Sequence, residues 1–393
     1  MRVLQLHSRY REPGGEDRVA EAEAALLRSA GHRVVQHWAE NPTGAVASAK
    51  VLLRSASNPT AARAVRNLVR HDRPDVAHVH NTWFALSSSV VTALKEAGVP
   101  VVSTLHNYRL MCLNSMLFRE GRPCMDCVGT APLPGIVHAC YRGSRALSAV
   151  AAGVIVSDRH RRTWEEGVDL FLVPTEFAGR LFEQSGLPPD RVRVKPHFTT
   201  DPGPREDPPS ASREVLFVGR LAPGKGLEVL LSAWSRLPDT SLRLTVIGDG
   251  PLRAELSRRA APGVRFLGRL PGVEVRRRML EARALVFPST WYEPFGMVLI
   301  EAMAAGLPVI GSDVGDAIAI VAPAVPGLLA RPGDAAALVE AIHMLEDDET
   351  VEVAGSAARG RYEANFTPAV NLPLLQAAYY SVIGPSGSRS LYP

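Results

Sequence analysis

The chain has 393 residues, of which 46% are hydrophobic and 21% are charged. This balance is typical of a globular protein with room for two domains, and it excludes a disordered or fibrous chain. The formal net charge of +4 fits an anionic ligand, whereas no motif or aromatic interleaving indicates nucleic-acid binding. The first residues lack the apolar run of a signal peptide, and no stretch of about 20 apolar residues occurs. We therefore expect a cytoplasmic protein without a membrane span.

Strand and helix patterns alternate in the first third of the chain. Residues 2–7 are a short apolar run that predicts a strand, and apolar residues at helical spacing from Val19 to Ala30 predict a helix that ends at Gly31. Three further strands are predicted at residues 33–37, 76–80 and 99–106. This order is typical of a parallel sheet with crossover helices.

Strand and helix patterns alternate again after residues 202–213, PGPREDPPSASR, which are rich in Pro and Ser and lack periodicity. The later strands are predicted at residues 215–219, 242–248, 264–267, 284–288 and 308–312. The sequence thus predicts an α/β protein with two Rossmann-like, doubly wound domains facing across a cleft. We expect the first domain at residues 1–200, a linker at 201–213 and the second domain at 214–371, with residues 372–393 completing the first domain.

Two loops that follow strands carry residues suited to an anionic ligand. In EPGGED, residues 12–17, Gly14 and Gly15 allow backbone N–H groups to approach a ligand at the start of a helix, although a plain turn explains them equally well. In GRLAPGKGLEVLL, residues 219–231, Arg220 and Lys225 flank a Gly-rich bend directly before a helix. Two cations at a helix N-terminus suit a diphosphate, and the spacing excludes a Walker P-loop.

The stretch YEPFGMVLIE, residues 292–301, places one carboxylate in a loop and another inside the following helix. Carboxylates only accept hydrogen bonds, so Glu293 and Glu301 suit the vicinal hydroxyls of two sugars, a transferred hexose and a ribose. A pair of glycosidase acids is the less attractive interpretation, because no second feature supports hydrolysis.

These residues resemble the E-x7-E pattern of retaining glycosyltransferases of family 4, which have the GT-B fold. VGRLAPGKG and AMAAGLPVIGSD match the family in the expected order, and TLHNYRL contains a histidine that the family places beside the donor sugar. The resemblance implies that the first domain binds the acceptor and the second the donor. It implies catalytic roles for Glu293, His106, Arg220 and Lys225. It also implies donor contacts by Gly14, Gly15, Arg220, Lys225, Phe266, Leu267, Glu293, Phe295, Gly296, Met297, Val298 and Glu301.

The implied reaction is sugar transfer from a nucleotide-diphosphate sugar, of UDP or GDP type, with retention at the anomeric carbon. No cofactor is expected for catalysis, because the cations replace a metal at the diphosphate. The acceptor is either polysaccharide- or lipid-linked, or a small secondary metabolite. Two departures from the family pattern, SDVGDAIA after residue 311 and KPHF at residues 195–198, leave the donor and acceptor open.

All four cysteines lie within residues 112–140 with the spacing C-x11-C-x2-C-x12-C. Clustering in a cytosolic protein favours a structural zinc site over disulfides, with unrelated thiols as the third interpretation. The predicted zinc ligands are Cys112, Cys124, Cys127 and Cys140.

Other functions remain open at this point. A nucleotide-sugar epimerase or a phosphorylase-like enzyme shares the fold, and a non-catalytic sugar-nucleotide-binding protein would bind without turnover. The basic runs at residues 159–162 and 276–278 are more often solvated helix faces, but they leave open a peripheral contact with the inner face of a membrane.

Overall fold

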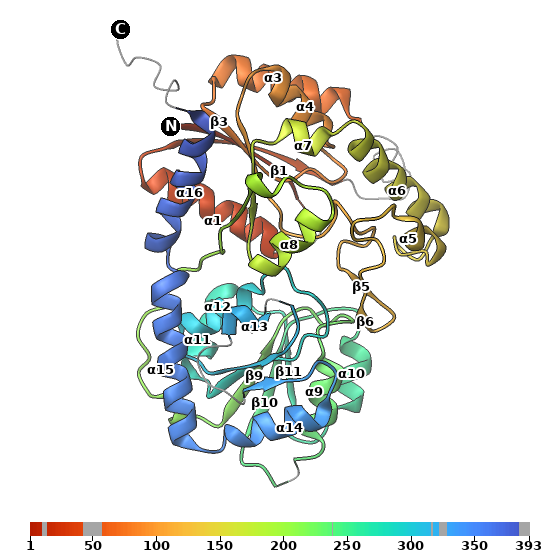
Figure 1. Cartoon of the computed structure of the whole chain (residues 1–393). Coiled ribbons are helices and arrows are strands. Elements are labelled where there is room, and N and C mark those ends of the chain that lie inside the picture. Colours follow the sequence, from red (N-terminus) through yellow and green to blue (C-terminus); the bar gives the residue numbers. More distant parts are fainter. Residues whose placement is uncertain (10–13, 42–56, 238, 316, 322–327, 385–393) are drawn as a thin grey trace. The chain divides into compact units, whose positions relative to one another are not determined.

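The computed structural model describes residues 1–9, 14–41, 57–237, 239–315, 317–321 and 328–384, so residues 10–13 of the predicted first loop lie outside it. The chain forms two compact units (Figure 1). The first unit contains Met1–Met116, Met125–Pro196 and the segment from Asn371, and the second contains Leu117–Cys124 and His197–Val370.

The first unit is built on a parallel sheet with the strand order β2-β1-β3-β4-β7-β8. β3 and β4 are buried along their whole length, including the polar residues His78, His80 and Asn81 of β3. The strand order reverses between β1 and β3, so the carboxyl ends of these strands form a topological switch point. The strands are β1 Arg2–Arg9, β2 Arg33–Glu40, β3 Val76–Asn81, β4 Val101–Thr104, β7 Leu170–Val173 and β8 Val192–Val194.

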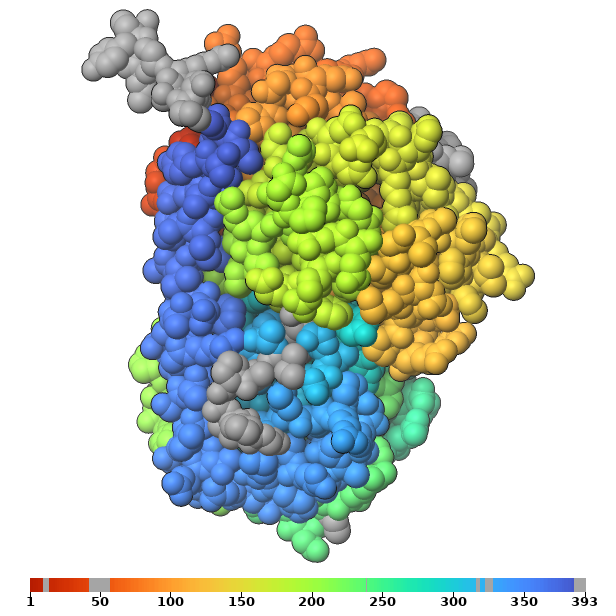
Figure 2. Space-filling view, viewed as in Figure 1, coloured from red at the N-terminus to blue at the C-terminus, as the bar shows by residue number. Residues whose placement is uncertain are grey.

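Helices and a C-terminal segment cover this sheet. They are α1 Gly15–Ser29, α3 Pro59–Asp72, α4 Ser89–Glu96, α5 Leu133–Val137, α6 Arg145–His160, α7 Thr163–Gly167, α8 Glu176–Gln184, the 3-10 turn η1 Pro189–Arg191 and α16 Pro368–Ile383. Leu375, Ala378 and Tyr379 of α16 share one core with residues of β1, α1 and β2. The blue C-terminal residues accordingly lie against red N-terminal residues in Figure 2.

The second unit repeats the architecture with the parallel strand order β11-β10-β9-β12-β13-β14. The strands are β9 Glu214–Val218, β10 Arg243–Ile247, β11 Arg265–Gly268, β12 Ala284–Phe287, β13 Val309–Ser312 and β14 Leu329–Ala330. The helices are α9 Leu227–Trp234, α10 Arg253–Arg259, α11 Gly272–Glu281, α12 Met297–Ala304, α13 Ala317–Val321, α14 Ala335–Met344 and α15 Asp348–Asn365. A short antiparallel pair, β5 Phe118–Arg119 and β6 Arg122–Pro123, is assigned to the same unit.

The Pro-rich segment at residues 201–213 packs on the second unit. Arg205 donates to the carbonyl oxygens of Met279, Ala282 and Ala305 at 3.0, 2.7 and 3.2 Å. The segment also contains the 3-10 turn η2 Pro209–Ala211, in which Pro209 is buried. Hydrogen bonds to backbone carbonyls therefore hold in place a stretch that lacks any periodic pattern.

We predict that Tyr379→Phe lowers the free energy of unfolding by about 1–2 kcal/mol, because it leaves a buried nitrogen without its partner. Tyr379 is fully buried, and its hydroxyl lies 2.8 Å from His78 Nδ1. The matched control is Tyr380→Phe, since Tyr380 is 58% exposed, and it should change stability by less than about 0.5 kcal/mol. Urea unfolding curves of the two variants measure the difference, and equal values would contradict the role of the hydrogen bond.

Candidate functional site

In the second unit, the loops after β9, β10 and β12 contact one another through their backbones. Leu221 N donates to Asp249 O at 2.9 Å, and Thr290 N donates to Gly224 O at 2.8 Å. Gly226 and Gly248 have φ angles of +73° and +143°, and a Cβ on either would overlap a carbonyl oxygen of the neighbouring loop. Only glycine allows this approach, so the three loops are held as one rigid surface.

Lys225 and Glu293 meet on this surface. The Lys225 ammonium forms an ion pair with Glu293 Oε1, which also accepts hydrogen bonds from Trp291 Nε1 at 2.7 Å and Ser289 Oγ at 3.2 Å. Lys225 Nζ lies 5.2 Å from the centroid of the Trp291 ring. Glu293 is buried, whereas the Lys225 side chain is about a quarter exposed. An ammonium has three donors, so Lys225 can bind an anion while it stays paired with Glu293.

The other predicted residues of the E-x7-E stretch lie at the start of α12. Gly296 is the residue before the helix and has φ +82°, and Met297 and Val298 form the first turn. The first N–H groups of any helix have no partner within the helix, so this end suits an anion. Glu301 is half-buried one turn further along α12, and Arg220 is exposed after β9. Neither has been tested against a ligand, and their roles stay predictions.

Three of the predicted donor residues use their side chains for packing. Phe295 is buried, and its ring lies 4.9 Å from that of His197. Phe266 and Leu267 on β11 pack against the two cores of the second unit. For the buried Phe295 only the backbone is left for a ligand contact, whereas Phe266 and Leu267 are half-buried.

In the first unit, Gly14 and Gly15 begin α1, but the Gly14 N–H already donates to Asp17 Oδ2 at 2.7 Å. Asp17 Oδ1 lies 2.9 Å from His7 Nε2, and both residues are buried. The Gly14 amide therefore fixes the start of the helix in this structure, and its predicted donor contact stays a prediction.

Glu16 lies beside this turn, at the switch point of the sheet. Asn107 Nδ2 donates to Glu16 Oε1 at 2.6 Å, and Asn81 Nδ2 lies 3.4 Å from Glu16 Oε2. Burial raises the pKa of Glu16 from 4.5 to about 6, against the opposing effects of Asn107 and of His7. A half-buried carboxylate with a raised pKa at a strand end is a candidate functional residue that the sequence analysis did not single out.

The predicted catalytic residue His106 is buried next to His80, with His106 Nε2 2.9 Å from His80 Nδ1. The two rings are stacked with centroids 5.2 Å apart. Burial lowers the pKa of His80 well below its ordinary value, so His80 is neutral and exchanges one hydrogen bond with His106. His106 thus continues a chain of buried polar residues at the carboxyl end of β4.

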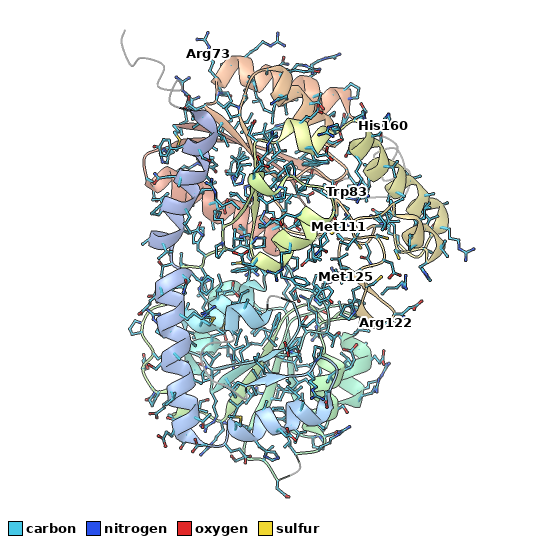
Figure 3. The ribbon with its side chains drawn as sticks, viewed as in Figure 1. Arg73, Trp83, Met111, Arg122, Met125 and His160 are labelled. Carbon is cyan, nitrogen blue, oxygen red and sulfur yellow. The ribbon has the colours of Figure 1, made fainter. Side chains whose placement is uncertain are left out.

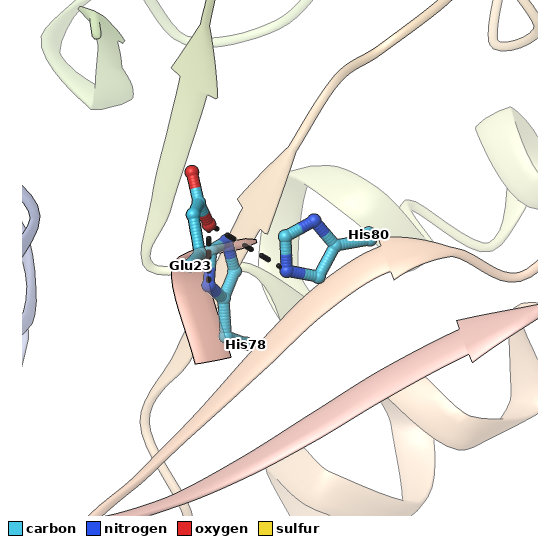
Figure 4. A group of neighbouring side chains, drawn as sticks. All are labelled: Glu23, His78 and His80. Carbon is cyan, nitrogen blue, oxygen red and sulfur yellow. Dashed lines mark ion pairs between the residues drawn. The ribbon is translucent and has the colours of Figure 1, made fainter. Parts of the chain in front are cut away.

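Glu23, His78 and His80 gather their ligand atoms within 4.8 Å of one another (Figure 4). Glu23 Oε2 lies 3.7 Å from both His78 Nδ1 and His80 Nε2. Glu23 Oε1, however, pairs with the buried Lys195 ammonium at 2.7 Å. Lys195 already compensates the only negative charge of the group, so a divalent cation would leave an uncompensated positive charge there. We interpret the group as a buried ion pair with two neutral histidines.

The four cysteines are thiols and not disulfides. Among the described residues, the Glu23, His78 and His80 group is the only one with three side chains close enough for one ion, so the structure does not gather three of the predicted zinc ligands. Cys124 is assigned to the second unit and the others to the first. The zinc site stays a prediction without geometric support.

Comparison with known proteins identifies the family of this chain. The model of glycosyl transferases group 1 matches residues 204–361, and the model of the glycosyl transferase 4-like domain matches residues 14–197. The chain belongs to this glycosyltransferase family. It is therefore a glycosyltransferase with the GT-B architecture, and the predicted family and fold are confirmed.

Two curated relatives illustrate the range of the family. The chain is 29% identical to the phosphatidyl-myo-inositol mannosyltransferase of Mycobacterium tuberculosis over 89% of this chain and 90% of that protein. It is also 29% identical to the sulfoquinovosyl transferase SQD2 of Arabidopsis thaliana, over 80% of this chain but only 57% of that protein.

Solved structures share the fold. HepE of Anabaena in complex with UDP has a TM-score of 0.67 and 19% identity, covering 96% of this chain and 99% of HepE. The sucrose-phosphate synthase of Thermosynechococcus elongatus has a TM-score of 0.71 and 21% identity, covering 96% of this chain and 98% of that chain. Within the described residues of this glycosyltransferase, no helix is both long and apolar enough to cross a bilayer.

We predict that Gly226→Ala lowers the free energy of unfolding by about 3 kcal/mol or more, because the added Cβ would overlap Pro288 O. Gly263→Ala is the matched control. Gly263 also has a positive φ, +91°, but open space at the Cβ position. Only the backbone strain of a left-handed alanine should therefore lower its free energy of unfolding, by about 1–2 kcal/mol. Thermal and denaturant unfolding compare the variants. Equal losses would show that the loops are not locked at Gly226.

We also predict how Glu16 links stability to pH. Its folded pKa of about 6 lies above the ordinary value of 4.5, so the folded state binds more protons than the unfolded state between these values. This residue therefore lowers stability as the pH rises from about 4.5 to about 6. Urea unfolding across this range should show the loss in wild type and in Glu21→Gln, an exposed residue of the same helix, but not in Glu16→Gln. An unchanged pH slope in Glu16→Gln would contradict the raised pKa.

Proposed function

We propose that this glycosyltransferase transfers a sugar from a nucleotide-diphosphate sugar, of UDP or GDP type, to an acceptor hydroxyl with retention at the anomeric carbon. The observation that carries the proposal is the pairing of Lys225 with Glu293 on the locked loops of the second unit. Lys225 supplies a cation that suits a diphosphate. Directly beside it, the buried carboxylate of Glu293 can accept hydrogen bonds from sugar hydroxyls.

In the proposed reaction the bond from the anomeric carbon to the diphosphate oxygen breaks, and a bond to the acceptor oxygen forms. Lys225, Arg220 and the N-terminus of α12 would stabilise the negative charge that builds on the departing diphosphate. The acceptor proton would pass to an oxygen of this diphosphate on the same face of the sugar, so that no metal and no covalent intermediate are needed.

Glu293 would bind the donor sugar rather than attack it. Three donors, Lys225, Trp291 and Ser289, contact its Oε1, and hydrogen bonds of this kind lower the nucleophilicity of a carboxylate. Glu301, one turn into α12, would hold the ribose hydroxyls. His106 would contribute from the first unit, whose pocket we assign to the acceptor.

The names of relatives support the substrate classes. HepE has been crystallised with UDP and with UDP-glucose, and a mannosyltransferase among the relatives acts on phosphatidyl-myo-inositol according to its name. We infer a similar donor for this chain, and an acceptor that is lipid- or polysaccharide-linked or a small molecule. A peripheral contact with the inner face of a membrane belongs to the same proposal.

The first test is a thermal-shift panel of UDP-, GDP-, ADP- and dTDP-sugars with wild type and Glu301→Ala. A ligand that binds only the folded state raises its apparent stability by about RT ln(1 + [L]/Kd). We predict that one nucleotide class raises the melting temperature of wild type by several degrees and that of Glu301→Ala much less. Glu352→Ala, which changes an exposed glutamate of α15 in the same unit, is the control and should behave as wild type. No shift with any nucleotide would contradict the donor site.

The stereochemical part has its own test. NMR of the product formed from an α-linked donor should show an α-linkage, since the proposal requires retention. A β-linked product would overturn the same-face mechanism. Turnover of the donor into an epimer without any acceptor would instead indicate an epimerase.

A further inference from the structure

A pocket in the first unit combines cations with aromatic rings. The segments after β3 and β4 line one side, and α6 and Trp164 line the other. The lining residues used below are Asn81, Trp83, Asn107, Arg109, Asp158 and Arg159. Asn81 and Asn107 are also the residues that contact Glu16, so the pocket adjoins the switch point of the sheet.

The lining residues have unused hydrogen-bond donors. Trp83 Nε1, Arg109 Nε and Arg159 Nη2 are buried and have no hydrogen-bond partner within the part of the chain that the structure describes. A buried donor without a partner costs stability, so three in the lining of one pocket require an explanation. Small adjustments of Trp83 and Arg159 would offer their two donors to a ligand rich in oxygen atoms.

The guanidinium of Arg109 is fixed before any ligand binds. Its Nη1 donates to Leu113 O and its Nη2 to Ser115 Oγ at 2.9 Å. Its Cζ lies 4.8 Å from the ring centroid of Trp83, which is labelled in Figure 3, and 5.6 Å from that of Tyr141. A stacked and hydrogen-bonded guanidinium loses little entropy on binding.

The positive charge of Arg159 is partly removed from solvent. Burial lowers the pKa of this guanidinium against the opposing effects of Cys127 and Glu165, while Nη1 donates to Thr130 O at 2.6 Å. A neutral carbonyl compensates a half-buried cation less well than an oxyanion does. The site is thus suited to receive a negative charge next to Arg159.

The one carboxylate in the lining is already occupied. Asp158 Oδ1 accepts from Ser88 Oγ at 2.7 Å and Oδ2 from Trp164 Nε1 at 3.3 Å, and Arg161 lies 3.7 Å from Oδ1. Burial raises the pKa of Asp158, against the opposing effects of Ser88, Trp164 and Arg161. His80, which also lines the pocket, does not change the net charge of the lining, because it is neutral and is hydrogen-bonded to His106.

We propose that this pocket binds a phosphate ester group of the acceptor, through Arg159 and Arg109 with Trp83 as an aromatic wall. The inference rests on the proposed function in treating the first unit as the acceptor unit. It narrows the acceptor to a molecule that carries phosphate near the hydroxyl that receives the sugar. The phosphate can come from a soluble phosphate ester or from a phospholipid head group, which share the same chemistry.

The test measures equilibrium binding of glycerol 3-phosphate and of vesicles containing phosphatidic acid, with pure phosphatidylcholine vesicles as the uncharged reference. Calorimetry and vesicle sedimentation are carried out in saturating UDP, which fills the donor diphosphate site if the proposed function holds. The variants are Arg159→Gln, which removes the charge, Arg159→Lys, which keeps it, and the control Arg145→Gln at the exposed start of the same helix.

We expect one of the two phosphate probes to bind wild type and Arg145→Gln equally, and Arg159→Gln at least about tenfold more weakly. Arg159→Lys should lie between them, and unchanged melting temperatures show that the variants fold. If Arg159→Gln does not fold, two other results support the proposal: wild type loses phosphate binding at high salt, and Arg159→Lys keeps it. The opposite results would contradict the proposal. Equal binding by all variants, or no binding of either probe to wild type, would overturn the proposal. Absence of binding of both UDP and GDP would overturn the proposed function separately.

Discussion

The close approach of three backbones in the second unit is the constraint on which the candidate donor site depends. Gly226, Gly248 and Gly250 each stand where a side chain would overlap a carbonyl oxygen of the next loop. Backbone hydrogen bonds between the loops then fix their separation. As a result Lys225 and Glu293, which lie 68 residues apart in sequence, form a direct ion pair on a surface that cannot relax easily. Electrostatic stabilisation of a leaving group requires this kind of preorganised site.

The first unit is held by a different interaction. The buried ion pair of Lys195 and Glu23 joins the end of β8 to α1, and Asn371 at the start of the C-terminal segment accepts from Lys195 Nζ at 3.0 Å. Asn371 in turn donates to Pro196 O at 2.7 Å. The same group explains why His78 and His80 are buried without charge. This group could not be predicted from the sequence, because Glu23, the two histidines and Lys195 lie far apart along the chain. Lys195 also belongs to the stretch at residues 195–198 that departs from the family pattern.

Much of the architecture could be predicted from the sequence, because short strand-like stretches such as residues 76–80 and 284–288 alternate with helical patterns, as in a parallel sheet. β8 Val192–Val194 and β14 Leu329–Ala330 were missed, since strands of three and two residues carry almost no periodic signal. β7 Leu170–Val173 was missed as well, although its four residues are all apolar. Residues 201–213 have no local pattern, and their packing depends on carbonyl groups about 75 to 100 residues away.

The candidate site was predicted in part. The spacing of Glu293 and Glu301 and the Gly-rich bend around Lys225 were recognisable, because both lie within short stretches. Trp291 and Ser289 were not singled out, although they directly precede Glu293 and could have been suspected from their place in a strand-end loop. Glu16 was missed because its raised pKa comes from burial, which depends on tertiary packing that includes Asn107, 91 residues away. The cysteine spacing suggested zinc, but spacing alone does not determine whether four sulfur atoms meet.

The measurement that tests the central claim most directly is calorimetric titration of UDP and of GDP into wild type and Lys225→Met, which keeps a long side chain but removes the charge. Lys95→Met, an exposed lysine of the first unit, serves as the matched control. The account predicts that the preferred nucleotide binds Lys225→Met at least about tenfold more weakly than wild type, with Lys95→Met unchanged. Equal affinity in all three proteins would contradict the role of the Lys225 and Glu293 pair in diphosphate binding.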